Sequence, residues 1–387
     1  MKICRIATIP FSLIHNLGDQ LDAIVNAGHE LDVVCSRGPG FEELQRRPGV
    51  TVHAIEMARM ISPIADLSAL VRLWRLYRRG NFDIVHSTTP KAGLLSAIAS
   101  LLARVPLRLH TFTGQPWATL LGPVRWLART SDWLITHLNT QCYADSASQR
   151  DFLIAEGLCR AAQVKVLGAG SIAGVDVDKI KQAALQHPAA ETKAALSIPE
   201  NSAVITFVGR VTRDKGIVEL ISAFDRVLRQ CPDCHLVIVG PLEPERDTLP
   251  AETLNTIRDH PRIRYTGYQL EPEKFLAAAD LLCLPSYREG FGNVVIEAAA
   301  IAVPTVGTSI VGLTDSVVDG ETGMLVPPMN EAALADALIC LLTNAEKRKK
   351  MGYAAERRAI TLFNSSHVSS LVMQEYLDLF KSKNSAR

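Results

Sequence analysis

Short apolar runs alternate along the chain with longer stretches in which apolar residues recur every three or four positions. In the first half, runs rich in Ile, Val and Leu predict strands at residues 2–8, 31–35, 51–55, 84–86, 107–112 and 164–167. The stretches between them have helical periodicity, as at residues 19–27, 67–79 and 92–103. Strands that alternate with helices predict parallel sheets covered by helices, the α/β fold class.

The second half repeats this pattern and then changes. Strands are predicted at 203–208, 236–239, 263–265, 281–284 and 305–306, and three helices without intervening strands at 331–342, 345–363 and 367–381. Residues 179–200 are rich in Ala, Gln, His and Pro and are predicted to contain the linker. We therefore expect Rossmann-like domains at 1–170 and 175–365 and a terminal helix at 366–387 that crosses back to the first domain. Two such sheets would hold a ligand in the cleft between the domains.

The composition excludes several classes of protein. Of the 387 residues, 48% are hydrophobic and 21% are charged, which excludes disordered, collagen-like and coiled-coil chains. The formal net charge of +1 excludes a bulk polycation that binds nucleic acid. Because the sequence has neither an apolar stretch of the ~20 residues that a bilayer span needs nor a signal peptide, we expect a cytoplasmic protein.

The charge is distributed unevenly, because residues 1–165 contain 18 Lys and Arg against 13 Asp and Glu. The arginines are interleaved with aromatic residues, and the set is Arg72, Trp74, Arg75, Tyr77, Arg78, Arg79, Arg104, Arg108, Trp117, Arg125, Trp126 and Arg129. A basic face with aromatic residues indicates contact with an anionic lipid surface or a phosphorylated ligand. A solvated helix face of no special function is the alternative.

Two short motifs have a simpler interpretation than their usual one. Residues 231–235 match the CxxC and CxxCH motifs of redox and haem proteins, but they lie between a predicted helix and a strand instead of opening a helix. Residues 168–173 resemble the dinucleotide fingerprint GxGxxA, but no long apolar helix follows them. We interpret the first as a coincidence and the second as an interdomain turn.

A first phosphate-binding signal follows the predicted strand at 203–208. The loop Gly209-Arg210-Val-Thr-Arg-Asp-Lys215-Gly leads from this strand into a helix. Arg210 can donate two parallel hydrogen bonds to a phosphate, and Lys215 supplies a compact charge. A charged turn at the start of a helix is the alternative.

The strongest signal is the segment PSYREGFGNVVIEA, which follows the predicted strand at 281–284 and leads into an Ala-rich helix. It places Glu289 in the loop and Glu297 eight positions later in the helix. Gly290 and Gly292 permit a close backbone approach, and free N–H groups at residues 293–295 are expected to hold a diphosphate. A capped helix with a buried carboxylate is the alternative.

These motifs together resemble retaining glycosyltransferase family 4, which has the GT-B fold. The resemblance rests on E-x7-E in EGFGNVVIEA, GRVTRDKG upstream and DGETGMLV downstream, with HSTTPKAGLL, HTFTGQPW and LGAGSIAGVDVDKI in the first half. It extends over nearly the whole chain and is closest to bacterial transferases that build capsule, O-antigen or exopolysaccharide repeat units. It implies two Rossmann-like domains facing across a cleft, with C-terminal helices packed back on the N-terminal domain.

The resemblance also implies a role for each matching residue. Arg210 and Lys215 would grip the donor diphosphate, and Glu289 would contact the donor sugar near its C3 and C4 hydroxyls. Glu297 would hold the ribose. The other donor-binding positions, with Tyr268 bordering the base, would be Gly18, Gly209, Tyr268, Gly290, Phe291, Gly292, Asn293, Val294 and Val295.

The N-terminal domain departs from the family pattern at two places. The first loop has the single glycine Gly18, near His15, where the family often has a glycine pair. Many members carry a histidine after the fifth strand, where this chain has Thr113 and Gly114. We place His15, Thr113 and Gly114 on the acceptor side and expect His110 to point into the core.

The predicted activity is metal-independent and needs no cofactor, because no Asp-x-Asp motif is placed to bind Mg²⁺ and Arg210 and Lys215 can stabilise the leaving diphosphate. A retaining hexosyltransferase would move a sugar from a nucleotide-sugar donor, UDP-linked by preference, to a lipid-diphosphate-linked saccharide at the inner face of the plasma membrane. Two alternatives remain: a GT-B sugar-nucleotide epimerase, and a non-catalytic two-lobe sugar- or nucleotide-binding protein.

Overall fold

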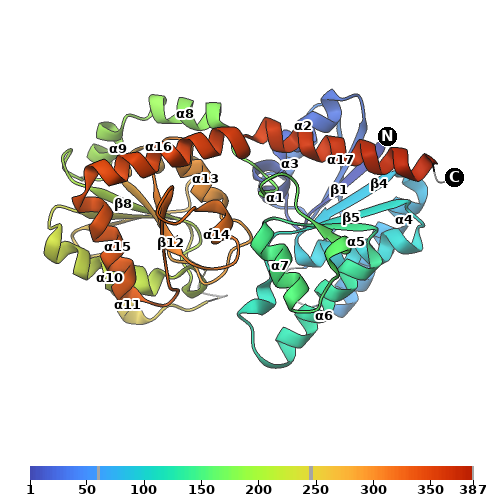
Figure 1. Ribbon diagram of the computed structural model, residues 1–387. Helices are drawn as coiled ribbons and strands as arrows, with labels where there is room; N and C mark the ends of the chain where they lie inside the picture. Colours follow the sequence, from blue (N-terminus) through green and yellow to red (C-terminus); the bar gives the residue numbers. More distant parts are fainter. Residues whose placement is uncertain (59–61, 244–246, 386–387) are drawn as a thin grey trace. The chain divides into compact units, whose positions relative to one another are not determined.

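The computed structural model describes residues 1–58, 62–243 and 247–385, which form two compact units (Figure 1). Unit 1 contains Met1–Gly174 and the terminal segment that begins at Ser365, and unit 2 contains Val175–Asn364. Each unit is built on a parallel β-sheet with helices packed against it. The predicted α/β class with two Rossmann-like domains is therefore confirmed.

Unit 1 has a seven-stranded sheet in the order β3-β2-β1-β4-β5-β6-β7. Its strands are β1 (Lys2–Ile6), β2 (Glu30–Cys35), β3 (Val50–Ala54), β4 (Ile84–Thr88), β5 (Leu107–Phe112), β6 (Gln141–Ala144) and β7 (Val164–Lys165). Its helices are α1 (Pro10–His15), α2 (Gly18–Asn26), α3 (Phe41–Arg46), α4 (Pro63–Gly80), α5 (Pro90–Leu102), η1 (Pro116–Ala118), α6 (Gly122–Leu138), α7 (Ala147–Ala155), η2 (Ala161–Gln163) and α17 (Ser365–Ser385).

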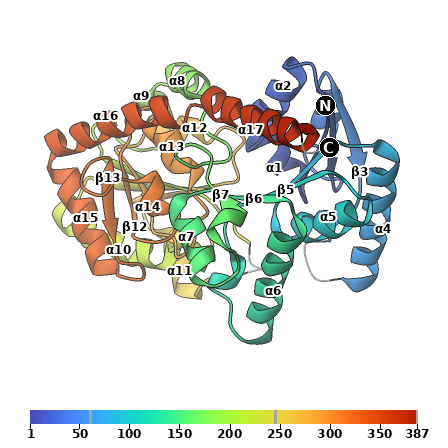
Figure 2. The same cartoon turned by 45° about the vertical axis from the view of Figure 1, so that its right-hand side comes forward.

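The strand β1 is buried on both faces of the unit 1 sheet, including the charged residue Arg5. Ile3 packs in a core shared with α2, α3 and α17, whereas Cys4 and Ile6 pack in a core shared with α4 and α5. Successive side chains of a strand point to opposite faces, so a strand with no polar alternation needs helices on both sides. The terminal helix α17 supplies part of this cover and lies beside α2 (Figures 1 and 2).

Unit 2 has a six-stranded sheet in the order β10-β9-β8-β11-β12-β13. Its strands are β8 (Val204–Val208), β9 (His235–Val239), β10 (Ile263–Gly267), β11 (Leu281–Leu284), β12 (Thr305–Thr308) and β13 (Gly323–Val326). Its helices are α8 (Val177–Gln186), α9 (Ala189–Ala195), η3 (Arg213–Lys215), α10 (Ile217–Gln230), α11 (Ala251–Asp259), α12 (Glu273–Ala277), α13 (Asn293–Ala299), α14 (Leu313–Ser316), α15 (Glu331–Thr343) and α16 (Ala345–Leu362).

The expectation of a linker within residues 179–200 is wrong. The segment forms α8 and α9, which belong to unit 2 and pack against α12. The side chain of Asp176 caps α8 by accepting a hydrogen bond from the backbone N–H of Lys179, and Ile180 is buried on the inner side of the helix. The Ala- and Gln-rich composition therefore reflects helices of low apolar content.

Two aromatic residues do not belong to the expected basic face. Tyr77 is buried between α4 and α5 and shares a hydrogen bond with the Ser96 hydroxyl, and Trp117 is buried and donates to Asp132. Burial of their large apolar rings is favourable because the Tyr77 hydroxyl and the Trp117 indole N–H each have a hydrogen-bond partner. Trp74 and Trp126 are exposed.

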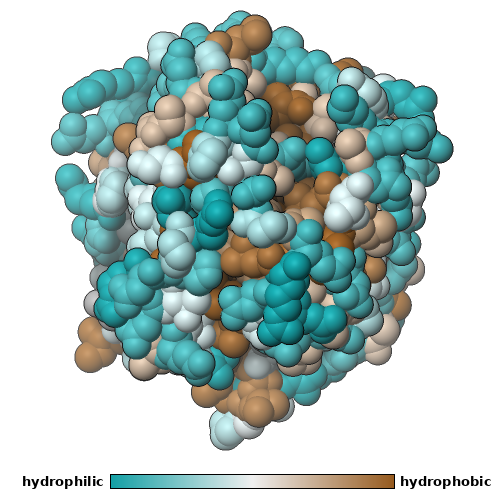
Figure 3. Space-filling model, turned by 90° about the vertical axis from the view of Figure 1, so that its left-hand side faces the viewer, coloured by the Kyte–Doolittle hydropathy of each residue, from teal (hydrophilic) through white to brown (hydrophobic). Residues whose placement is uncertain are grey.

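In the described part of the chain, no helix is both long and apolar enough to cross a bilayer. The face seen in Figure 3 is covered mainly by hydrophilic side chains, with hydrophobic side chains in smaller groups between them. The Gly-rich segment 168–173 forms turns instead of opening a helix, with positive φ at Gly168, Gly170 and Ser171.

Candidate functional site

The carboxyl ends of the unit 2 strands carry most of the predicted donor-site residues. The backbone N–H of Gly209, after β8, donates to the Val239 carbonyl at 2.9 Å. That of Gly240, after β9, donates to the Gly267 carbonyl at 2.8 Å. The loops after β8, β9 and β10 therefore begin at one edge of the sheet, and β11 lies beside β8 in the same sheet.

The loop after β8 touches the loop after β11. Gly216 has a φ of +70°, and a Cβ atom at this position would lie 2.0 Å from the Pro285 carbonyl oxygen, so only glycine fits. The Tyr287 N–H donates to the Asp214 carbonyl at 2.9 Å, and the Arg288 guanidinium donates to the Asp214 carboxylate at 3.1 Å. These contacts hold the two sequence motifs against each other.

The two strongest catalytic candidates form an ion pair. Lys215 Nζ lies 2.5 Å from Glu289 Oε1, and both side chains are largely shielded from solvent. The Ser286 hydroxyl donates to the same oxygen at 2.8 Å, and Ser286 is fully buried. Two donors therefore fix the carboxylate of Glu289, and the ion pair fixes the ammonium group of Lys215 beside the loop after β11.

Arg210 lies in a second cluster of charges on the same loop. Its guanidinium lies 3.0 Å from Glu243 and 3.6 Å from Asp214. Burial alone would raise the pKa of Asp214, but the hydrogen bond from Thr212 and the charges of Arg210, Arg288 and Lys215 lower it below its ordinary value. Asp214 therefore stays ionised and holds its neighbouring cations in place.

The second glutamate of the E-x7-E motif lies one turn inside α13. Burial raises the pKa of Glu297 to about 7, with a further contribution from the charge of Glu273. Among the described residues, none donates a hydrogen bond to its carboxyl group. A desolvated carboxyl group without a protein partner is chemically suited to bind a ligand hydroxyl.

The start of α13 corrects one prediction. The backbone N–H of Val295 donates to the Gly292 carbonyl at 2.9 Å, so it is not free to hold a diphosphate. The first turn of α13 closes tightly and uses this group itself. Phe291 is buried and packs edge-on against Phe363 at 5.0 Å, so its side chain belongs to the core, and only its backbone can face a ligand.

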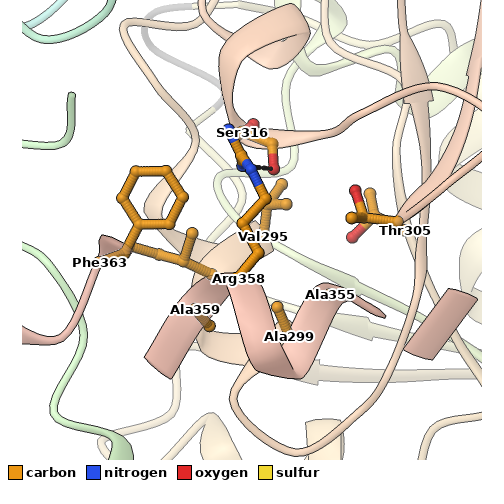
Figure 4. Close-up of a pocket in the computed structure, with 10 residues that line it drawn as sticks. Val295, Ala299, Thr305, Ser316, Ala355, Arg358, Ala359 and Phe363 are labelled. Carbon is orange, nitrogen blue, oxygen red and sulfur yellow. Dashed lines mark hydrogen bonds between the residues drawn. The ribbon is translucent and has the colours of Figure 1, made fainter. Parts of the chain in front are cut away.

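The pocket shown in Figure 4 lies behind α13 and is not the candidate site. Arg358 crosses it and donates to the carbonyl oxygens of Asp315 and Ser316 at 2.6 and 3.0 Å. Its other walls are mainly apolar and include Val295, Ala299, Ala355, Ala359 and Phe363. This pocket packs α16 against α13 and contains none of the predicted catalytic residues.

Tyr268 follows β10 and has an exposed fraction of 55%. An exposed aromatic ring at the ligand edge of a sheet can stack on a base. Gly267, directly before it, has a φ of +67°, which lets the chain turn out of the strand.

The predicted residues of unit 1 lie in two loops at the carboxyl edge of its sheet. His15 ends α1 as an exposed side chain whose ring lies 4.3 Å from that of Phe11, and Thr113 is exposed directly after β5. Gly114 is buried. His110 is buried in β5 beside Ser87, and burial lowers its pKa to about 3, so the prediction of a core histidine is confirmed.

Gly18 begins α2 and lies against a basic residue outside the family motifs. Arg47 donates to the Gly18 carbonyl at 2.7 Å and pairs with Asp22. A Cβ atom at position 18 would lie 3.4 Å from the Arg47 guanidinium, in van der Waals contact with it. The charge of Arg47 stands next to the loop from which donor contacts were expected.

Several residues of the site had no sequence signal strong enough to select them. They are Ser286, Arg288, Asp214, Glu243 and Arg47. Ser286 and Arg288 directly precede the E-x7-E motif and Asp214 lies in GRVTRDKG, so proximity to the candidate residues was their only available signal.

Comparison with known proteins identifies the family. Residues 16–170 match the family model "Glycosyl transferase 4-like domain", and residues 189–358 match the model "Glycosyl transferases group 1". The capsular polysaccharide biosynthesis glycosyltransferase CapM of Staphylococcus aureus is 30% identical over 94% of this chain and 93% of that protein. The chain belongs to this glycosyltransferase family.

Two further similarities agree with this assignment. The Escherichia coli UDP-Gal:alpha-D-GlcNAc-diphosphoundecaprenol alpha-1,3-galactosyltransferase is 25% identical over 94% of this chain and 93% of that protein. The crystal structure of Anabaena HepE in complex with UDP and glucose superposes with a TM-score of 0.80 at 19% identity, covering 98% of this chain and 100% of that one. The fold of this glycosyltransferase is thus GT-B, as the resemblance implied.

Proposed function

We propose that this glycosyltransferase transfers a sugar from a UDP-linked donor to a lipid-diphosphate-linked saccharide and retains the anomeric configuration. The observation that carries the proposal is the pair Lys215–Glu289, which brings a cation for the diphosphate and a carboxylate for the sugar into contact. The names of the Escherichia coli and Staphylococcus aureus relatives support the acceptor class and the role in a surface polysaccharide. The UDP bound to HepE supports the nucleotide.

In the proposed reaction, the acceptor hydroxyl attacks C1 of the sugar from the face that the diphosphate leaves. The new bond joins C1 to the acceptor oxygen, the bond from C1 to the phosphate oxygen breaks, and that phosphate oxygen takes the acceptor proton. Arg210 and Lys215 neutralise the charge that develops on the diphosphate. Glu289 holds the sugar hydroxyls, Glu297 holds the ribose, and Tyr268 borders the base. The side-chain cations supply the charge without a metal ion.

Unit 1 supports the proposal of a membrane-associated enzyme. Helices α4, α5 and α6 pack in one layer, α4 and α6 each against α5 (Figure 2). Apolar side chains are exposed at α6, where Leu121, directly before the helix, and Trp126, within it, have exposed fractions of 86% and 67%. The arginines of α4, namely Arg72, Arg75, Arg78 and Arg79, are exposed. Such a layer combines apolar anchors with charges that attract anionic lipid.

The first experiment measures nucleotide release from UDP-, GDP- and dTDP-sugars, with and without a membrane extract of the source cells. Release that depends on one donor and on the extract supports the proposal, and NMR of the product linkage then tests retention. Interconversion of UDP-sugars without an acceptor would identify an epimerase. If no donor in the panel releases nucleotide and no nucleotide stabilises the protein against heat, the result would favour a binding protein.

Variants connect this activity to the site. Glu289→Ala and Lys215→Ala should abolish most of the release. Lys181 and Glu356 form an equally close ion pair of 2.6 Å between α8 and α16 of the same unit, so Lys181→Ala and Glu356→Ala are matched controls. Near-wild-type turnover in both site variants would reject the assignment.

A further inference from the structure

Ser286 lies beneath the candidate carboxylate in the loop after β11. Its hydroxyl donates to Glu289 Oε1 at 2.8 Å, and its own backbone carbonyl accepts a hydrogen bond from the Thr308 hydroxyl of β12. The residue is fully buried. A buried hydroxyl requires a partner, and the acceptor that the structure gives to the Ser286 hydroxyl is Glu289.

Both donors to Glu289 bind the same oxygen atom. Lys215 Nζ and Ser286 Oγ lie 2.5 and 2.8 Å from Oε1. Among the described residues, no hydrogen bond is made to Oε2. A carboxylate oxygen that accepts two hydrogen bonds has little capacity for a third, so a ligand hydroxyl would bind through Oε2.

We propose that Ser286 is a positioning residue that fixes Glu289 so that Oε2 is presented to the hydroxyl groups of the donor sugar. This inference rests on the proposed function, because it assigns the sugar contact to Glu289. Lys215 can leave Oε1 when it engages the diphosphate. Ser286 is fully buried and would leave its hydroxyl without an acceptor if it turned away, and its backbone is held to β12 through Thr308. Ser286 therefore keeps the Glu289 carboxylate in the same orientation while Lys215 moves from Oε1 to the diphosphate.

The inference predicts an effect on the sugar and not on the nucleotide. Binding of UDP alone does not use Glu289 Oε2, whereas binding of a UDP-sugar does. Ser286→Ala should leave the Kd of UDP unchanged and raise the Kd of the UDP-sugar about tenfold, the size expected for a misplaced charge-assisted hydrogen bond. Ser286→Cys, which keeps a weak donor of similar size, should have an intermediate effect.

The experiment is calorimetric titration with UDP, UDP-glucose, UDP-galactose and UDP-N-acetylglucosamine. It compares the wild-type protein with Ser286→Ala, Ser286→Cys, Glu289→Gln and the double variant Ser286→Ala/Glu289→Gln. Ser202→Ala is the matched control, because Ser202 is a buried serine just before β8, at the opposite edge of the same sheet. The thermal midpoint of each variant establishes that it is folded.

A role through Glu289 predicts that the two substitutions are not additive. In the Glu289→Gln background, Ser286→Ala should change the Kd of the UDP-sugar by less than about twofold. Equal weakening of UDP and UDP-sugar by Ser286→Ala, or full additivity in the double variant, would overturn the inference and leave the proposed function intact. If the wild-type protein binds no nucleotide, the proposed function itself fails, and the inference fails with it.

Discussion

Lys215 and Glu289 are 74 positions apart in the sequence, and their charged groups lie 2.5 Å apart at the carboxyl edge of the unit 2 sheet. The contact arises because β8 and β11 are neighbours, so the loops that follow them meet. In parallel α/β sheets, this edge is where ligands bind. In this structure the Lys215 ammonium group and Oε1 of Glu289 satisfy each other.

Replacement of Lys215 should affect the chemical step more than donor affinity. Lys215→Ala removes a cation from the departing diphosphate and should lower kcat by about 10²- to 10³-fold, as loss of one such stabilising group does elsewhere. Lys215→Arg keeps the charge but not the compact geometry and should recover only part of the activity. The measurement is nucleotide release at saturating donor, with Lys181→Ala as control. A variant with raised KM and unchanged kcat would contradict this role.

Glu297 predicts a pH dependence of stability. Its pKa is raised by burial from 4.5 to about 7 in the folded protein. The folded state therefore keeps a proton that the unfolded chain releases, and the stability linked to this group is complete below pH 4.5 and is lost as the pH rises through 7. The variant Glu297→Gln has no titrating group at this position, so its stability does not fall with pH for this reason.

The test compares the free energy of unfolding of Glu297→Gln and wild type between pH 5 and pH 8. The variant should gain on the order of 2 kcal/mol relative to wild type over this range. Asp132 and Asp145 also have pKa values raised to about 7 by burial, but they are present in both proteins and cancel in the difference. A difference that does not change with pH would rule out the raised pKa.

Tyr376 should anchor α17 to β1 and β4 of unit 1. Its hydroxyl lies 2.5 Å from the guanidinium of Arg5 and 2.6 Å from Nδ1 of His86, and all three side chains are buried. Arg5 Nε and Nη2 have no hydrogen-bond partner among the described residues. Tyr376→Phe keeps the ring but removes a partner from a buried cation, which should cost about 1–3 kcal/mol.

Thermal unfolding monitored with limited proteolysis of the C-terminal segment tests this prediction. Tyr376→Phe should lower the unfolding temperature of unit 1 and expose α17 to cleavage. Tyr353→Phe is the control, because Tyr353 lies exposed on α16. Equal protease resistance of the two variants would show that α17 is held without the Tyr376 hydroxyl, by its apolar contacts and by the bonds of Glu375 to Lys165 and Tyr143.

Local patterns explain why the fold and the catalytic motifs could be predicted. The strand β11 is a continuous apolar run and β8 is interrupted only by Thr206, and the two motif loops follow them directly, so the carboxyl edge could be identified from the sequence. Tyr77 could also have been placed correctly, because Ala69, Leu73 and Tyr77 recur every four residues along one side of α4 and are all buried. Its position among arginines concealed this periodicity.

The rest of the site depends on contacts between distant segments. Arg288 pairs with Asp214, which lies 74 positions away. Nothing in the sequence around either residue indicates that the two are partners. The N–H of Val295 was expected to be free because the sequence cannot show how tightly the first turn of a helix closes. The strands β6 and β13 were not predicted, because each has only four residues and mixes Gly, Gln, Tyr or Met with its apolar positions.

Exposed charges on α4 predict electrostatic binding to anionic vesicles. Arg72, Arg75, Arg78 and Arg79 form no ion pair among the described residues. Each arginine near an anionic surface contributes about 1 kcal/mol, and the contribution is screened by salt. Reversal of two charges in Arg75→Glu/Arg79→Glu should therefore weaken binding at least about thirtyfold.

Cosedimentation with vesicles of phosphatidylethanolamine, with and without phosphatidylglycerol, measures this effect. The charge reversals should abolish the dependence on phosphatidylglycerol, and Trp126→Ala should weaken binding to both compositions, because an apolar anchor does not depend on lipid charge. Lys349→Glu/Lys350→Glu is the matched control, since these lysines are exposed on α16 of unit 2. If the control weakens binding as much as the α4 variant, net charge and not the α4–α6 layer attracts the protein to the membrane.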